Sequence, residues 1–217
     1  MTYTDIAGCV CVIDDDAEVR GAIGSLLRSH GFEIQLYDSS TAFLAAGAPA
    51  KVSCLVLDIR LSGESGLDFQ DKMADHAIAM PVVLITGHGD IPMTVRGMRA
   101  GAIDVLTKPF DDDQLLAAIA RALYFDAARR TEVAATADLH AGFDRLTPRE
   151  KEVMALVVTG LMNKQIAAKL ALSEITVKIH RGNLMRKMAA QSLADLVRMA
   201  EQLGIRDVAI HRHHPSV

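Results

Sequence analysis

The feature that most constrains this chain is a short apolar run, residues 55–57, which ends in the carboxylate of Asp58. Such a run is typical of a buried parallel strand whose last side chain emerges at the carboxyl edge of a sheet. A second apolar run, residues 10–13, ends in the same way, in Asp14, Asp15 and Asp16. Open α/β sheets bind their ligands at that edge. The two runs therefore predict one acidic pocket.

Crowded carboxylates repel one another unless a cation lies among them. Hard oxygen ligands with open positions favour Mg²⁺. Thr86 and Lys108 also fall at or just past the ends of predicted strands, where a hydroxyl and an ammonium can hold a phosphoryl group. We therefore interpret Asp58 as a nucleophile that accepts a phosphoryl group. Taken singly, each residue has an ordinary alternative: a helix cap, a turn or an exposed lysine before proline.

The first 123 residues alternate between strand and helix patterns. Strands are predicted at residues 10–13, 32–37, 54–57, 81–86 and 103–106, with helices after each of them. This alternation predicts a five-stranded parallel sheet covered on both faces, and a doubly wound arrangement is the natural expectation. Lys108 precedes Pro109, a composition that permits a cis peptide bond.

From residue 146 onward only short helices are predicted. Residues 147–150 (TPRE) form a capping-box pattern, and Asn163, Ser173 and Ser192 are the expected caps of three further helices. The helix after Ser173 has its apolar positions at Ile175, Ile179, Leu184, Met185 and Met188. Four short helices with tight connections predict a compact second domain. Residues 124–141 either extend the preceding helix or form a flexible linker.

Charge is distributed unevenly along the chain. Residues 142–217 carry 12 Lys and Arg against 7 Asp and Glu, a net +5, whereas residues 1–141 carry 11 against 20, a net −9. A basic final third indicates a polyanionic partner for that part alone, although a soluble basic surface is the simpler alternative. Cys9, Cys11 and Cys54 lie in or beside apolar strands, which favours reduced, buried thiols. With no signal-peptide or membrane-span pattern, we expect a cytoplasmic protein.

The segments around the predicted pocket resemble the receiver domain of two-component response regulators. The resemblance covers residues 8–123 and rests on the segments at residues 13–16 (IDDD), 57–60 (LDIR), 85–90 (ITGHGD) and 107–110 (TKPF), the third of which is most similar to the FixJ-like subfamily. It implies that a sensor histidine kinase phosphorylates Asp58. Mg²⁺ would be bound by Asp15, Asp58 and the backbone carbonyl of Arg60, with Asp14 acting through water. Thr86 and Lys108 would contact the phosphoryl group.

Two positions depart from the usual receiver pattern. The customary proline after the nucleophile is Ser62 here, which leads us to expect a more mobile loop. The position three before the lysine, commonly an aromatic residue that rotates on activation, is Val105. A signal must then leave the pocket through backbone and packing changes.

The helices after Asn163 and Ser173 have helix-turn-helix spacing, and six basic residues accompany them: Lys164, Lys169, Lys178, Arg181, Arg186 and Lys187. On spacing alone, a four-helix protein-interaction module remains an alternative. The segments at residues 146–150 (LTPRE), 163–167 (NKQIA) and 176–181 (TVKIHR) resemble the LuxR-type DNA-binding domain over residues 142–207. The resemblance implies that Lys178 and Ile179 contact bases, with Thr176, Arg181 and Asn183 near the DNA backbone. Lys164 is a further DNA-binding candidate, because its positive charge suits a phosphate contact. In that family a further position often contacts a base, and this position is Gly182 here, which has no side chain.

These observations predict a transcriptional response regulator of the FixJ/NarL type. Its expected parts are an α/β receiver domain at residues 8–123, a linker at 124–141, an all-α LuxR-type domain at 142–207 and a disordered tail at 208–217. Expected partners are a sensor histidine kinase, promoter DNA, RNA polymerase and a second copy of the chain after phosphorylation. We expect no association with a membrane. Beyond slow self-dephosphorylation we expect no enzymatic activity.

Three alternatives remain open at this point. An aspartate-nucleophile phosphohydrolase would need a second acid at the position of Arg60. A regulator of the same fold whose activity ignores phosphorylation is a further hypothesis. The histidines at 211, 213 and 214 suit either a metal-binding tract or a disordered end.

Overall fold

The computed structural model describes residues 8–87 and 91–205. The chain divides into two compact units, Met1–Thr131 and Glu132–Val217, and each is described by itself. The predicted tail at 208–217, with its three histidines, lies outside the described residues, as do residues 88–90. No helix within the described ranges is both long enough and apolar enough to cross a lipid bilayer.

In the described part of the first unit, five parallel strands form one sheet in the order β2-β1-β3-β4-β5. The strands are β1 (Cys9–Ile13), β2 (Glu33–Tyr37), β3 (Ser53–Asp58), β4 (Val82–Thr86) and β5 (Asp104–Thr107). Every residue of β1, β3 and β4 is buried, as expected for central strands covered on both faces. The strand order reverses between β1 and β3, which is where doubly wound sheets bind their ligands. The predicted fold class is confirmed.

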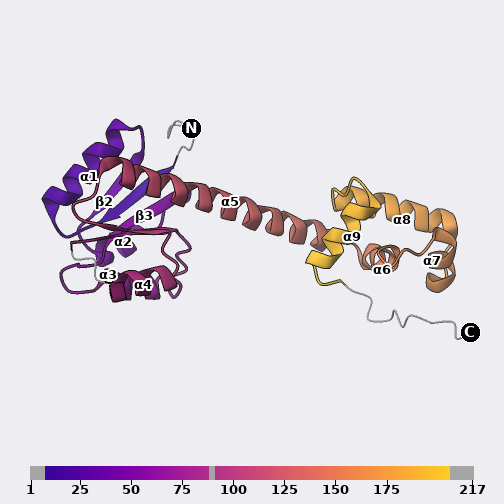
Figure 1. The fold of residues 1–217 in the computed structure, drawn as a ribbon. Helices are drawn as coiled ribbons and strands as arrows, with labels where there is room; N and C mark the ends of the chain where they lie inside the picture. Colours follow the sequence, from indigo (N-terminus) through magenta and orange to yellow (C-terminus); the bar gives the residue numbers. More distant parts are fainter. Residues whose placement is uncertain (1–7, 88–90, 206–217) are drawn as a thin grey trace, which may run out of the picture. The chain divides into compact units, whose positions relative to one another are not determined.

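Helices cover both faces of this sheet (Figure 1). They are α1 (Ala17–Ser29), α2 (Ser40–Ala46), α3 (Gly66–Lys72), α4 (Ile91–Arg99) and the first part of α5 (Asp112–Asp144). Helices α1 and α5 supply apolar side chains to the core on one face, including Leu27 of α1 and Leu123 of α5. Phe43 of α2 and Phe69 of α3 belong to the core on the other face. The sheet is thus held between two apolar layers, and only its ends are left for polar chemistry.

Helix α5 continues through residues 124–141 without interruption. Its middle is tied to the amino-terminal end of β3 by the buried Asp126, which accepts a 2.9 Å hydrogen bond from the backbone N–H of Ser53. Arg129 and Arg130 also donate to Asp126, each at 2.6 Å, and Arg130 donates to the carbonyl of Ala50. Burial alone would raise the pKa of Asp126, but the bonds from Arg130 and Arg129 outweigh it and lower the pKa.

The second unit contains the end of α5 followed by four short helices in its described part. These are α6 (Pro148–Val157), α7 (Asn163–Leu170), α8 (Glu174–Lys187) and α9 (Leu193–Gln202), and their core includes Val153, Ile166, Val177, Leu184 and Leu196. The predicted capping box is confirmed, with Thr147 and Glu150 bonded reciprocally. Ser173 and Ser192 cap α8 and α9 as predicted.

Two local predictions in this unit were wrong. The N-cap of α7 is Met162, and the side chain of Asn163 instead accepts a 2.7 Å bond from Arg181. Ile175 is 73% exposed because Val177 takes the inward position at the start of α8. Ile179, a second of the predicted apolar positions of this helix, is 57% exposed.

Candidate functional site

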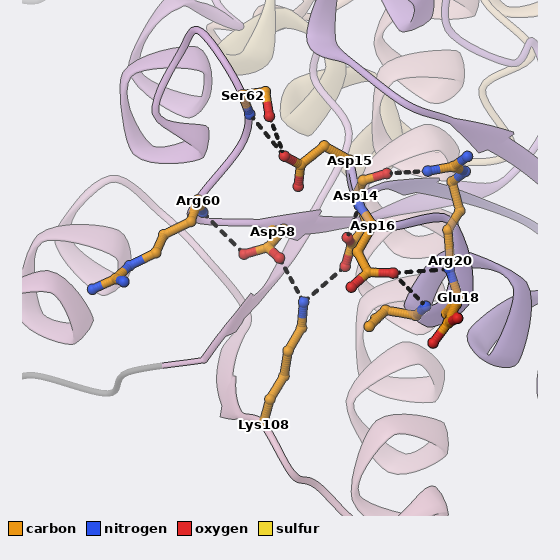
Figure 2. Close-up of polar contacts among 10 residues, drawn as sticks. Asp14, Asp15, Asp16, Glu18, Arg20, Asp58, Arg60, Ser62 and Lys108 are labelled. Carbon is orange, nitrogen blue, oxygen red and sulfur yellow. Dashed lines mark hydrogen bonds and ion pairs between the residues drawn. The ribbon is translucent and has the colours of Figure 1, made fainter.

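The carboxyl ends of the central strands bring the predicted receiver residues together. Ile13 pairs with Leu57 across β1 and β3, so Asp14 and Asp58 end adjacent strands. Thr86 is the last residue of β4 and pairs with Thr107 of β5, which Lys108 follows directly. Figure 2 shows Asp14, Asp15, Asp58 and Lys108 converging from these separate strand ends. The sheet register alone therefore places side chains from four distant stretches of sequence in one pocket.

Lys108 bridges the two buried carboxylates of the pocket. Its Nζ donates to Oδ2 of Asp58 at 2.5 Å and to Oδ2 of Asp14 at 2.8 Å (Figure 2). Burial alone would lower the pKa of Lys108, but its bonds to Asp14 and Asp58 outweigh that effect and raise it. Burial raises the pKa of Asp14, although the bond from Lys108 opposes this. The Lys108–Pro109 peptide bond is cis.

Asp58 is only 6% exposed, and the start of the following loop holds its second oxygen. Oδ1 accepts a 2.9 Å bond from the backbone N–H of Arg60. The loop then folds back, and Gly66 N–H donates to the carbonyl of Ile59. A Cβ at residue 66 would lie 2.1 Å from the carbonyl oxygen of Asp58, so this approach requires glycine. Asp58 is therefore held by close backbone contacts from the loop that follows it.

The three aspartates can share one cation. Each of Asp14, Asp15 and Asp58 offers a carboxylate oxygen, and these oxygens lie within 4.8 Å of one another. Asp15 is exposed, and both the backbone N–H and the hydroxyl of Ser62 donate to its Oδ2. The hydroxyl bond from Ser62 lowers the pKa of Asp15, which favours a charged carboxylate at the mouth of the pocket. An all-oxygen, charged donor set with access to solvent fits Mg²⁺.

Two contacts of the pocket were missed by the sequence analysis. Arg20 of α1 donates to the carbonyl of Asp14 at 2.6 Å, and Ser62 bonds Asp15 as described above. The signal for Arg20 was its position one helical turn after Asp16, which caps α1. The sequence did not pair Ser62 with Asp15, because their contact depends on how the loop after Asp58 folds back. Thr86 is buried at the end of β4 and forms further interactions.

In the second unit, α7 and α8 form a helix-turn-helix. The turn contains Ala171 with a left-handed φ of 52°, and Ala167 and Val177 pack into the common core. The outer surface of α8 presents Ile175, Lys178 and Ile179, and a Cβ added to Gly182 would meet nothing within 4 Å. Lys164 of α7 is exposed as well, whereas Thr176, Arg181 and Asn183 are partly buried.

Some of the basic and polar residues of this helix pair already have partners within the unit. Lys187 donates to the buried Glu150 at 2.7 Å, and Asn183 accepts from Arg186 at 2.8 Å. Arg181 is bonded to Asn163, as noted above. Lys178 on the outer surface of α8 and Lys164 of α7 are exposed and take no part in these bonds.

A doubly wound sheet with three clustered aspartates, a hydroxyl and a lysine at its carboxyl edge is the arrangement expected of a receiver fold, here in one chain with a helix-turn-helix unit. Family comparison agrees with both assignments. The model of the response regulator receiver domain matches residues 10–120, and that of the bacterial regulatory proteins of the luxR family matches residues 144–200. The chain therefore belongs to the two-component response regulators with a LuxR-type DNA-binding domain.

Individual relatives span almost the whole chain. Nodulation protein W of Bradyrhizobium diazoefficiens is 53% identical over 94% of this chain and 90% of its own length. The structure of the response regulator StyR superposes with a TM-score of 0.84 at 46% identity, covering 90% of this chain and 99% of StyR. Full-length FixJ from B. japonicum gives a TM-score of 0.56 at 39% identity, covering 92% of this chain and 98% of FixJ.

Membership of this family implies two general properties. Receiver domains typically bind Mg²⁺ in an acidic pocket of the kind formed by the three aspartates. A response regulator with a DNA-binding domain acts between a kinase and promoter DNA.

Proposed function

We propose that Asp58 accepts a phosphoryl group from the phosphohistidine of a sensor kinase. A carboxylate oxygen of Asp58 attacks phosphorus, an acyl phosphate bond forms, and the phosphorus–nitrogen bond to histidine breaks as the imidazole leaves. The observation that carries this proposal is the position of Asp58: buried at the end of β3, beside two further carboxylates and in contact with the ammonium of Lys108. A lone buried carboxylate would lack the positive charge that phosphoryl transfer needs.

The proposed Mg²⁺ ligands are Asp15, Asp58 and the backbone carbonyl of Arg60, with Asp14 acting through water. A bound Mg²⁺ would neutralise charge on the phosphoryl oxygens. The close oxygens of the three aspartates support this assignment. Asp14 is fully buried, which suits a role behind Asp15, which faces solvent.

Phosphorylation is proposed to redistribute the contacts of Lys108 and Thr86. The new group adds a charge of about −1.5 to −2 next to an ammonium that now bridges two carboxylates. Lys108 and Thr86 would turn to the phosphoryl oxygens, and β5 and α4 would adjust with them. Because residue 105 is valine, the adjustment reaches the surface through packing of β5 rather than through a rotating aromatic ring.

The surface formed by α4 and β5 is the proposed dimer contact. Ile91, Val95 and Met98 of α4 are exposed apolar side chains, and together they offer a second copy an apolar strip on one helix. Dimerisation would place two helix-turn-helix units on half-sites about one helical turn, roughly 34–36 Å, apart.

The proposed domain organisation follows the predicted boundaries. Residues 8–123 form the receiver domain, residues 124–141 the linker and residues 142–207 the DNA-binding domain. Lys178 and Ile179 would contact bases, and Lys164, Thr176, Arg181 and Asn183 would lie near the DNA backbone. Arg181 would have to release Asn163 or contact DNA with its remaining N–H groups. RNA polymerase is the proposed downstream partner.

Intact-mass spectrometry after incubation with acetyl phosphate and Mg²⁺ tests the phosphoacceptor. The wild-type chain should gain the mass of one phosphoryl group, Asp58→Asn should gain none, and the label should decay slowly through self-dephosphorylation. A label that persists in Asp58→Asn would refute the assignment. Rapid turnover of phosphomonoesters that depends on Asp58 would instead identify a phosphohydrolase.

A further inference from the structure

Ser62 makes a contact that the proposed phosphoryl transfer does not itself explain. It lies in the loop between β3 and α3, four residues after Asp58, and reaches across to the end of β1. Its hydroxyl donates to Oδ2 of Asp15 at 2.5 Å, and its backbone N–H donates to the same oxygen at 3.1 Å (Figure 2). One residue thus supplies two donors to a single carboxylate oxygen.

Two converging donors fix the orientation of the Asp15 carboxylate. A carboxylate at a pocket mouth otherwise rotates among several rotamers, and this freedom is lost when a cation binds. Figure 2 shows the other oxygen of Asp15 turned away from Ser62. The Ser62 contacts therefore hold Oδ2 of Asp15 and leave its other carboxylate oxygen available to a cation.

The loop is also closed by contacts of its own. Arg60 and Ser65 form a bridge across it, and Gly66 N–H donates to the carbonyl of Ile59 at 2.9 Å. The hydroxyl of Ser65 donates to that same carbonyl at 3.5 Å. Because the loop is closed by its own backbone, the two bonds from Ser62 act chiefly on Asp15.

We propose that Ser62 is a positioning residue that orients Asp15 for divalent-cation binding and couples the β3–α3 loop to the occupied metal site. The inference rests on the proposed Mg²⁺ site and adds to it a residue that is not itself a ligand. Proline at this position could supply neither bond, since it has no N–H and no hydroxyl. Serine at this position therefore restrains the exposed Asp15 carboxylate, which proline could not do.

Groups that orient metal ligands commonly change affinity by about 10- to 100-fold when removed. Ser62→Ala removes the hydroxyl bond and keeps the N–H bond, and the site is open to water, so we expect a smaller loss of cation affinity, about 3- to 10-fold. Ser62→Pro removes both donors and should weaken binding further. Ser62→Thr keeps both and should bind within about 2-fold of wild type.

Titration of the full chain with Mn²⁺, followed by the electron paramagnetic resonance signal of the free ion, measures this directly and requires no phosphorylation. Ser65→Ala is the matched control: it removes a serine hydroxyl from the same loop without touching Asp15. The proposal is supported if wild type, Ser62→Thr and Ser65→Ala bind Mn²⁺ with similar affinity. Ser62→Ala should bind it more weakly, and Ser62→Pro most weakly of all. Circular dichroism of each variant without metal establishes that it is folded before it is titrated.

Several results would overturn the inference. Equal affinities for wild type and Ser62→Ala would show that the hydroxyl does not position Asp15, and tighter binding by Ser62→Ala would show that it competes with the cation. Equal weakening by Ser65→Ala would assign the effect to loop stability. If the wild-type chain binds no Mn²⁺ and Asp15→Asn behaves identically, the proposed metal site fails, and the role of Ser62 fails with it.

Discussion

The Nζ atom of Lys108 lies 2.5 Å from Oδ2 of Asp58, and the same ammonium also reaches Asp14. In this arrangement the lysine side chain compensates part of the negative charge that a bound metal ion would also neutralise. Lys108 therefore contributes to stability before phosphorylation as well as to the proposed phosphoryl binding after it.

Replacing Lys108 by glutamine should destabilise the receiver unit, because it leaves two buried carboxylates without their cation. Removing one partner of a buried pair costs about 3–5 kcal/mol, and partial exposure of Lys108 reduces this to about 2–3 kcal/mol in the free energy of unfolding. Urea unfolding with and without Mg²⁺ measures it, and Mg²⁺ should restore part of the loss. Lys51→Gln, which breaks the exposed pair with Glu33, is the control and should change stability little. Equal losses for the two variants would contradict the role of Lys108.

Asp126→Ala should loosen α5 from the end of β3. The substitution removes the acceptor for Ser53 N–H and leaves Arg129 and Arg130 without their shared carboxylate, a loss of about 3–5 kcal/mol. Hydrogen exchange should rise at residues 49–54 and 124–131. Asp138→Ala, an exposed position on the same helix, should leave exchange in both segments unchanged. A uniform increase over the whole receiver unit would point to general unfolding instead.

The pH dependence of stability should carry a contribution from Glu150, which is 3% exposed and bonded to Lys187. Burial alone would raise its pKa, but the bonds from Lys187 and Thr147 outweigh it and lower the pKa in the folded state. The stabilisation is therefore complete above the unfolded value of about 4.3 and is lost as pH falls through the lower folded value. The difference in unfolding free energy between wild type and Glu150→Gln should shrink over that window. Glu152→Gln, an exposed position on the same helix, should show little difference at any pH.

Two lysines of α8 should behave differently toward DNA. Lys178 projects outward, so Lys178→Ala should weaken binding to a duplex selected by the chain from a random library, by about 1–3 kcal/mol, and relax base preference at one position. Lys187 is held by Glu150, so Lys187→Ala should mainly lower stability. Fluorescence anisotropy at several salt concentrations, paired with urea unfolding, separates the two effects. The assignment fails if Lys187→Ala loses affinity and Lys178→Ala does not.

The pattern of apolar runs and helix-capping residues in the sequence made much of this structure predictable. Apolar runs ending in Asp14, Asp58 and Thr86 located three strands and their shared edge, because parallel strands in register must end together. Caps at Ser173 and Ser192 were predictable because hydroxyls at these positions satisfy free N–H groups at helix starts.

Side-chain pairing across long stretches of sequence was not predictable. The bond from Ser62 to Asp15 depends on how a loop folds back over the sheet, and Lys187 meets Glu150 only once α6 and α8 have packed. Helical periodicity likewise could not tell whether Ile175 or Val177 would face the core at the start of α8. Packing against neighbouring helices decided that choice.

The central claim is that phosphorylation of Asp58 controls DNA binding. Its most direct test is the affinity of the full chain for the selected duplex before and after treatment with acetyl phosphate and Mg²⁺, in wild type and in Asp58→Asn. The account predicts tighter binding by treated wild type and no change in Asp58→Asn. An Asp58→Asn chain that binds as tightly as the treated wild type would show that DNA binding ignores phosphorylation, and would contradict the account.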